Sequence, residues 1–166
     1  MRGKERPDDT ILLPALIAAP LHADVVVTFQ DSAPKDIFSI RHDGTCPLSG
    51  ALNIDIGAAP SGLIFDTAAS GAGVQVFQPF EVTEGASVLL SVPVISDGDS
   101  LISLAIQDLV PGDIIRFTID VDDTTSRRQI TVDGSEIAGA VASFEGGSGR
   151  FDAKGTARIP VPGCFS

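Results

Sequence analysis

The stretch DGDSLISLAIQDLVPGDIIRFTIDVD, residues 97–122, contains the pattern that decides the fold class. Ile102, Leu104 and Ile106 alternate with Ser103, Ala105 and Gln107, and apolar and polar residues alternate again over 115–121. The turn dipeptide Pro111-Gly112 separates the two segments. Such alternation is typical of a strand that packs one face on a core. A helix over 99–110, which lacks Gly and Pro, is the alternative. Because turn residues flank both segments, we predict two strands joined as an antiparallel hairpin.

The rest of the sequence repeats this arrangement of short strands and tight turns. Three further β-branched or alternating runs are predicted strands: Val25–Phe29, Ile37–Ile40 and Leu52–Ile56. Two more hairpins are predicted at Asp-Gly turns: Asp97-Gly98 between 92–95 and 101–106, and Asp133-Gly134 between 129–132 and 136–143. No strand–helix–strand period is visible. The sequence therefore predicts an all-β protein, an antiparallel β-sandwich or jelly-roll of about nine to eleven strands.

Phenylalanine supplies all of the aromatic bulk, because the chain has 9 Phe and neither Trp nor Tyr. Seven of these residues are spread along the strands and are expected to fill the core: Phe29, Phe38, Phe65, Phe77, Phe117, Phe144 and Phe151. Their even distribution predicts one continuous core and a single domain over residues 24–166.

Residues 1–23 have the pattern of a secretory signal peptide. The apolar run Ile11–Leu21 is too short for a membrane span of about 20 residues. Basic residues precede the run, and Ala23 is the small residue that a signal peptidase requires. Acidic residues among the basic ones leave open the alternative that the segment is a structural strand. We expect export, with a mature protein that is secreted or periplasmic and has no membrane span.

The charge balance excludes two classes of partner. The chain has 22 acidic and 11 basic residues, which gives a net charge of −11. The leader contains as many acidic as basic residues, so this charge belongs to residues 24–166. Surfaces that bind nucleic acid or anionic membranes need clustered Lys and Arg, which this chain lacks. The 43% hydrophobic and 20% charged residues are typical of a folded domain.

The two cysteines, Cys46 and Cys164, are expected to form a disulfide in an oxidising compartment. The bond would fasten the Pro-rich C-terminal tail to a loop near the N-terminus, and closing so long a loop is worth about 4–5 kcal/mol. A reactive Cys-His pair of Cys46 with His42 is the alternative. Asp43 lies between these two residues and disfavours it, because a reactive thiol needs an electropositive environment.

The densest acidic cluster is Asp120-Val121-Asp122-Asp123, at the end of a predicted strand. Alternation places Asp120 and Asp122 on the same exposed face, about 7 Å apart. Calcium takes hard oxygen ligands in flexible geometry, so a calcium site formed by Asp120, Asp122, Asp123 and Glu81 is the functional hypothesis. Other candidates to complete the shell are Glu84, Asp97 and Asp99. The alternative is a solvated acidic strand end that keeps an edge from pairing with another chain.

A short motif suggests an enzyme, but its chemistry is incomplete. Gly98-Asp99-Ser100-Leu101 has the sequence that names a family of serine esterases. A serine nucleophile needs a base, which in that family is a histidine near the C-terminus, whereas the last histidine here is His42. The pattern therefore indicates a protein that is not an enzyme.

Four phrases of the C-terminal half carry a resemblance to a known group: Ser96–Asp99, Leu109–Asp113, Phe117–Asp123 and Ser135–Ala140. The chain resembles secreted bacterial proteins called aggregation factor core proteins. The resemblance implies an exported β-rich surface protein and transfers no active-site residue. We therefore expect cell-surface adhesion or matrix interaction with a protein or glycan partner. A carbohydrate-binding or carbohydrate-active jelly-roll is the alternative, although the missing Trp and Tyr remove the usual sugar-stacking platforms.

Overall fold

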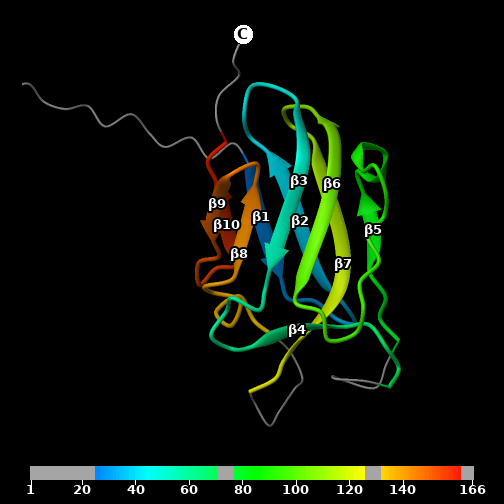
Figure 1. Cartoon of the computed structure of the whole chain (residues 1–166). Coiled ribbons are helices and arrows are strands. Elements are labelled where there is room, and N and C mark those ends of the chain that lie inside the picture. Colours follow the sequence, from blue (N-terminus) through cyan, green and yellow to red (C-terminus); the bar gives the residue numbers. More distant parts are fainter. Residues whose placement is uncertain (1–24, 71–76, 126–131, 162–166) are drawn as a thin grey trace, which may run out of the picture.

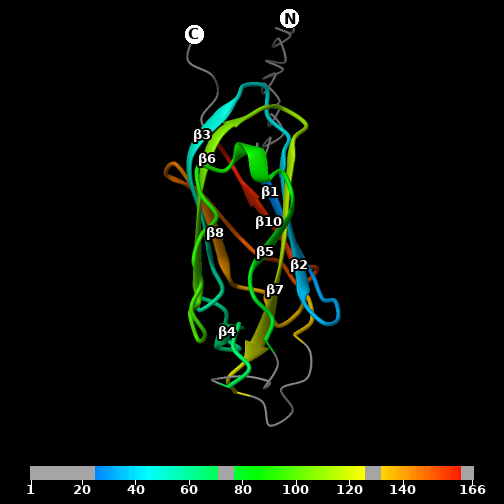
Figure 2. The same ribbon diagram turned by 90° about the vertical axis from the view of Figure 1, so that its right-hand side faces the viewer.

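Two antiparallel sheets pack face to face in the computed structural model, which describes residues 25–70, 77–125 and 132–161 (Figures 1 and 2). The all-β prediction is confirmed. Within the described residues there are ten strands: β1 (Val25–Gln30), β2 (Asp36–His42), β3 (Leu48–Asp55), β4 (Leu63–Asp66), β5 (Glu81–Glu84), β6 (Leu101–Leu109), β7 (Ile114–Asp123), β8 (Val141–Phe144), β9 (Gly147–Arg150) and β10 (Thr156–Ile159). One 3-10 helix, η1 (Ala86–Val88), follows β5.

The first sheet has the order β10-β1-β2-β7, and two short strands complete its edge. Both pair with β7, β5 along its middle and β4 along its end. The second sheet has the order β6-β3-β8-β9. Figure 2 shows the two sheets edge-on as separate layers, with β4 at the lower end of the molecule.

The segment 101–109 is strand β6, as predicted, and the helical alternative does not form. Its neighbour across Pro111-Gly112 is not its hairpin partner, however, because β6 pairs with β3 while β7 pairs with β2. The predicted hairpin is therefore wrong, and the turn connects the two sheets. The apolar faces of β6 and β7 face each other across the core, which buries both without pairing the two backbones.

The two Asp-Gly hairpins also differ from the prediction. Residues 92–95 are not a strand, although the preceding Leu90 N–H donates to Ala105 O of β6 at 2.9 Å. Pro93 lies in this segment and has no N–H for a ladder. After the second turn, the carboxylate of Asp133 accepts the N–H groups of the next residues and winds 134–140 into turns, so β8 begins only at Val141. Residues 129–131 lie outside the described part of the chain.

Six of the seven phenylalanines predicted for the core are buried, and the exception is Phe77, which is 69% exposed. Phe77 precedes the edge strand β5, and Phe80 packs inward in that region, with its ring centroid 4.9 Å from that of Phe117. The Phe117 ring also stacks on Phe38, at 5.0 Å. These rings join the central strands β2 and β7 to the edge strand.

Two glycines close one side of the sandwich. β9 belongs to the second sheet and β10 to the first, and the two strands lie against each other at the left of Figure 1. A side chain on Gly147 would overlap the carbonyl oxygen of Pro160, and one on Gly149 would overlap that of Arg158. The absence of a Cβ at both positions therefore allows the sheets to meet.

The expected leader, residues 1–23, and Cys164 lie outside the described residues, so the signal peptide and the disulfide stay predictions. The other cysteine, Cys46, is in the loop between β2 and β3. The buried His42 holds this loop: its Nδ1 accepts the Gly44 N–H at 3.1 Å and its Nε2 lies 2.6 Å from Cys46 O. Both ring nitrogens thus bind backbone, which favours a structural role for His42. In the described part, no helix is long and apolar enough to cross a membrane.

Candidate metal centre

Three aspartates meet where β4 pairs with the end of β7. In the register of this ladder, Asp66 lies opposite Asp120, and Ile64 lies opposite Asp122. Because side chains alternate between the faces of a sheet, the three carboxylates project from the same face, away from the core. One oxygen of each carboxylate lies within 4.8 Å of the other two. We call Asp66, Asp120 and Asp122 the acidic site.

Asp66 is the most deeply buried member, at 0% exposure, and neither of its carboxylate oxygens meets hydrogen-bond geometry with a donor, although the Ala68 N–H and the Asp97 carboxyl are close enough to influence its pKa. The turn at Ser96–Ser100 covers it, because Phe65 N–H donates to Asp99 O at 2.7 Å and Gly98 N–H donates to Phe65 O at 2.9 Å. Asp122 is 4% exposed and Asp120 is half-buried. A buried carboxylate without donors is costly, so this group requires an explanation.

Burial and the neighbouring carboxylates raise the pKa values of two members of the acidic site. Burial, followed by the neighbouring carboxyls of Asp97 and Asp122, raises the pKa of Asp66 to about 6. Burial, followed by the charges of Asp122 and Asp66, raises the pKa of Asp120 to about 7. In both cases the cause is a low-dielectric environment with like charges nearby. Perturbed carboxylates gathered at one place are typical of functional sites.

Asp36 lies next to the acidic site on β2 and responds to the same environment. Its two oxygens accept the N–H groups of Ser32 at 3.1 Å and Val121 at 3.0 Å. Burial raises its pKa to about 7, against the opposing effect of these two hydrogen bonds. Asp36 therefore stabilises the end of β7 from the neighbouring strand β2, and both of its carboxylate oxygens accept backbone N–H groups.

These pKa values predict an unusual dependence of stability on pH in the presence of a chelator. Between pH 5 and 8 the unfolded carboxylates are largely ionised, whereas Asp36, Asp66 and Asp120 keep protons in the folded state until about pH 6–7. The folded protein then binds more protons, so its free energy of unfolding falls as pH rises through this window. We expect the melting temperature in EDTA to be several degrees higher at pH 5 than at pH 8. A melting temperature that rises over this range would contradict the assignment.

The structure brings together Asp120 and Asp122 and adds Asp66, which sequence reasoning did not identify. Asp122 was expected on an exposed face, and this part is wrong, since the residue is 4% exposed where β4 pairs with β7. Asp66 ends the short run Leu63-Ile64-Phe65-Asp66, whose three consecutive apolar residues are consistent with a buried strand. Which strand lies beside it depends on long-range pairing, so its neighbours could not be read from the run.

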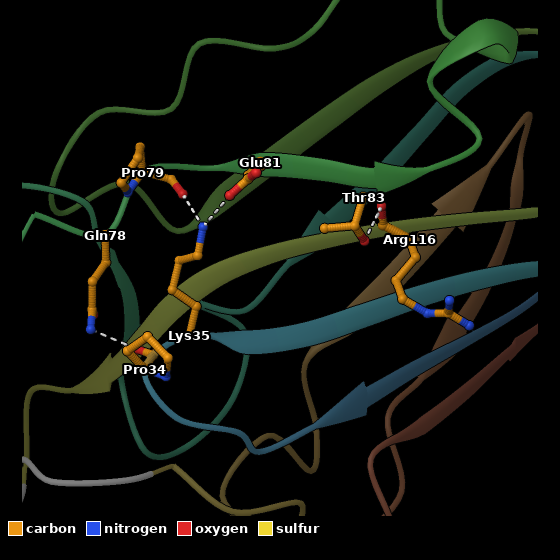
Figure 3. A network of polar contacts seen from close by, with 7 residues as sticks. All are labelled: Pro34, Lys35, Gln78, Pro79, Glu81, Thr83 and Arg116. Carbon is orange, nitrogen blue, oxygen red and sulfur yellow. Dashed lines mark hydrogen bonds and ion pairs between the residues drawn. The ribbon is translucent and has the colours of Figure 1, made fainter.

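The other predicted ligands have different neighbours. Asp123 is 4% exposed, and its Oδ1 accepts the Thr125 N–H at 2.9 Å. Glu81 pairs with Lys35, whose Nζ is 2.9 Å from Glu81 Oε2 and also donates to Pro79 O (Figure 3). The structure thus places Glu81 in a surface network on β5. That network also contains the hydrogen bond from Gln78 to Pro34 O and the one from Thr83 to Arg116 O.

The remaining alternatives for the shell also have assigned contacts. Glu84 forms an ion pair with Arg116. Asp99 Oδ2 accepts the Ser96 N–H at 2.8 Å and so stabilises its own turn. Asp97 Oδ1 accepts the N–H groups of Thr67 at 3.1 Å and Ala68 at 3.3 Å, which fixes its carboxyl beside Asp66. Of these three, Asp97 is the residue that borders the acidic site.

The dimensions and donors of the acidic site suit a hard divalent cation. Calcium–oxygen distances are about 2.3–2.6 Å, so oxygens on opposite sides of one ion are about 5 Å apart. The spread of at most 4.8 Å lets one oxygen from each aspartate bind the same ion. All three donors are carboxylates, which calcium prefers and which zinc and copper sites supplement with imidazole or thiolate.

No family model, curated protein or solved structure matches this chain.

A second concavity lies near the other end of the sandwich. It is lined by Glu84, Gly85, Ser87, Val88, Gly112, Asp113 and Ile114. The carboxylate of Glu84 is paired with Arg116, and Asp113 Oδ2 accepts the Val110 N–H at 3.3 Å. Both acids have structural contacts, so the acidic site is the stronger candidate for function.

Proposed function

We propose that this chain is an exported, non-enzymatic β-sandwich that binds calcium at the acidic site and acts in cell-surface adhesion or matrix interaction. The single observation that carries the calcium proposal is Asp66. It is fully buried, lacks hydrogen-bond partners and lies opposite a second carboxylate. A divalent cation bound there would neutralise two of the three charges and coordinate buried oxygens that lack a hydrogen bond of good geometry.

Export and adhesion rest on different support. The leader pattern and the predicted disulfide point to an extracytoplasmic protein. The sandwich fold is common among cell-surface modules, although a fold alone does not define a function. A calcium site of three carboxylates, with affinity of about 10⁻⁴–10⁻³ M, would be filled at extracellular calcium levels.

Calorimetric titration of the full chain with calcium tests the site. We expect one ion per chain for the wild type and at least a tenfold loss of affinity for Asp66→Asn, because ligand charge sets affinity. At a calcium concentration about 100 times the Kd, the ion should stabilise the wild type by about 2.7 kcal/mol, which raises the melting temperature by about 5–10 °C. The variant should lose this rise.

Asp108→Asn is the matched control. Asp108 is exposed on β6 in the second sheet, and asparagine tolerates its positive φ of 56°. This variant should bind calcium like the wild type. Equal affinities of all three proteins, or no heat and no stabilisation of the wild type at 10 mM calcium, would refute the acidic site.

A further inference from the structure

The strand that contributes Asp66 is the link between a turn and the sheet. β4 is only four residues long and pairs with β7 on one side. On its other side Phe65 exchanges two hydrogen bonds with the turn at Ser96–Ser100, one from Gly98 N–H and one to Asp99 O. The turn is thus joined to β7 through β4, while its last residue, Ser100, also accepts the Ile56 N–H at 2.9 Å. Loosening β4 would therefore free the Ser96–Asp99 part of the turn from this edge of the sheet.

Acidic side chains occupy all three of these neighbouring segments. Asp97 is on the turn, Asp66 on β4, and Asp120 and Asp122 on β7. Asp66 and Asp120 face each other directly in the ladder, where like charges destabilise strand pairing. Asp97 Oδ1 accepts the N–H groups of Thr67 and Ala68, the two residues that follow Asp66, so its carboxylate also lies close to Asp66. Repulsion among ionised carboxylates thus acts across both sides of β4.

The buried, unpartnered oxygens of Asp66 indicate where this repulsion is relieved. Both oxygens are buried and neither meets hydrogen-bond geometry with a donor, although the Ala68 N–H and the Asp97 carboxyl lie nearby. A cation at the acidic site would attract the carboxylates of β4 and β7 to one point and also lower the repulsion between Asp66 and Asp97. The free energy of cation binding would therefore stabilise the paired arrangement of β4, β7 and the Ser96–Ser100 turn.

We infer that calcium locks β4 and the Ser96–Ser100 turn onto β7, so that calcium concentration controls whether this end of the sandwich is closed. The inference rests on the proposed calcium site and adds a regulatory role to it. Surfaces near β4 would be presented in one arrangement with calcium and would open locally without it.

Amide hydrogen exchange of the full chain at pH 7.5, with 5 mM calcium or with EDTA, tests the lock. Phe65 and Gly98 donate the two informative N–H groups. We expect 5 mM calcium to slow their exchange by about 6- to 50-fold, the factor 1 + [Ca]/Kd for a Kd of about 10⁻³–10⁻⁴ M, because binding suppresses local opening. Control amides in the β8–β9 hairpin should change less than twofold, because β8 and β9 belong to the other sheet.

Asp97→Asn provides a second readout. Its side-chain oxygen can still accept from Thr67 and Ala68, while its charge is removed. This variant should bind calcium, protect Phe65 and Gly98 better than the wild type in EDTA, and show a smaller calcium effect there. Asp108→Asn should behave as the wild type.

The outcomes separate the two proposals. If calorimetry detects calcium binding but the protection at Phe65 and Gly98 changes no more than at the control amides, the lock is wrong and the calcium site stands. If calorimetry detects no binding, both proposals are wrong.

Discussion

We expect Gly149→Val to abolish cooperative folding or to lower the free energy of unfolding by at least about 3 kcal/mol. The valine side chain would overlap Arg158 O, a backbone atom that cannot rotate away. Arg158 pairs with Val26 in the β10–β1 ladder, and Gly149 pairs with Ala142 in the β9–β8 ladder. Relieving the overlap therefore requires moving one sheet edge. Urea unfolding followed by circular dichroism measures the effect.

A valine introduced one residue earlier, at Ser148, is the control. Ser148 is exposed on β9, so Ser148→Val adds the same side chain without meeting β10. Its unfolding midpoint should stay near that of the wild type. Gly149→Ala should be intermediate, since a single methyl group already overlaps Arg158 O. A Gly149→Val protein as stable as Ser148→Val would contradict the close approach of the two sheets.

Phe117→Ala should lower the free energy of unfolding by about 3–5 kcal/mol. Phe117 is fully buried and contacts the rings of Phe38 and Phe80, so the substitution opens a cavity and removes two aromatic contacts. This is a large part of the total stability of about 5–15 kcal/mol expected for a single domain. Equilibrium urea unfolding gives the value directly.

Phe77→Ala is the matched control, because Phe77 is 69% exposed. It should change the free energy of unfolding by less than about 0.5 kcal/mol, as is usual for surface positions. Similar losses for both variants would mean that the aromatic core is wrongly assigned.

Local patterns predicted the strands better than they predicted the pairing. Alternation in Leu101–Ile106 identified β6, because one buried face imposes a period of two wherever the strand pairs. The reversal of the chain at Pro111-Gly112 was also predicted correctly, although the pairing of its two flanking strands was not. A reversal can pair two strands in one sheet or carry the chain to the facing sheet, and the local residues are compatible with both.

In the acidic site too, the local part of the arrangement could be predicted and the long-range part could not. Asp120 and Asp122 share a face because they are two residues apart on one strand, which the sequence displays. Asp66 joins them from a strand far away in the chain, and its burial depends on the Ser96–Ser100 turn. Glu81 was predicted as a ligand from its charge, whereas its nearest cation is Lys35. Register and partner choice are long-range properties that residue type does not encode locally.

The pairing of the first described strand with the last has a consequence for the order of folding. Val25 lies opposite Ile159, so β1 gains its second neighbour only when β10 is present. A ribosome-bound chain cannot complete the first sheet before β10, Thr156–Ile159, emerges. Such non-local topology slows folding. A chain that folds slowly stays unfolded for longer, which suits a protein that we propose crosses a membrane before it folds.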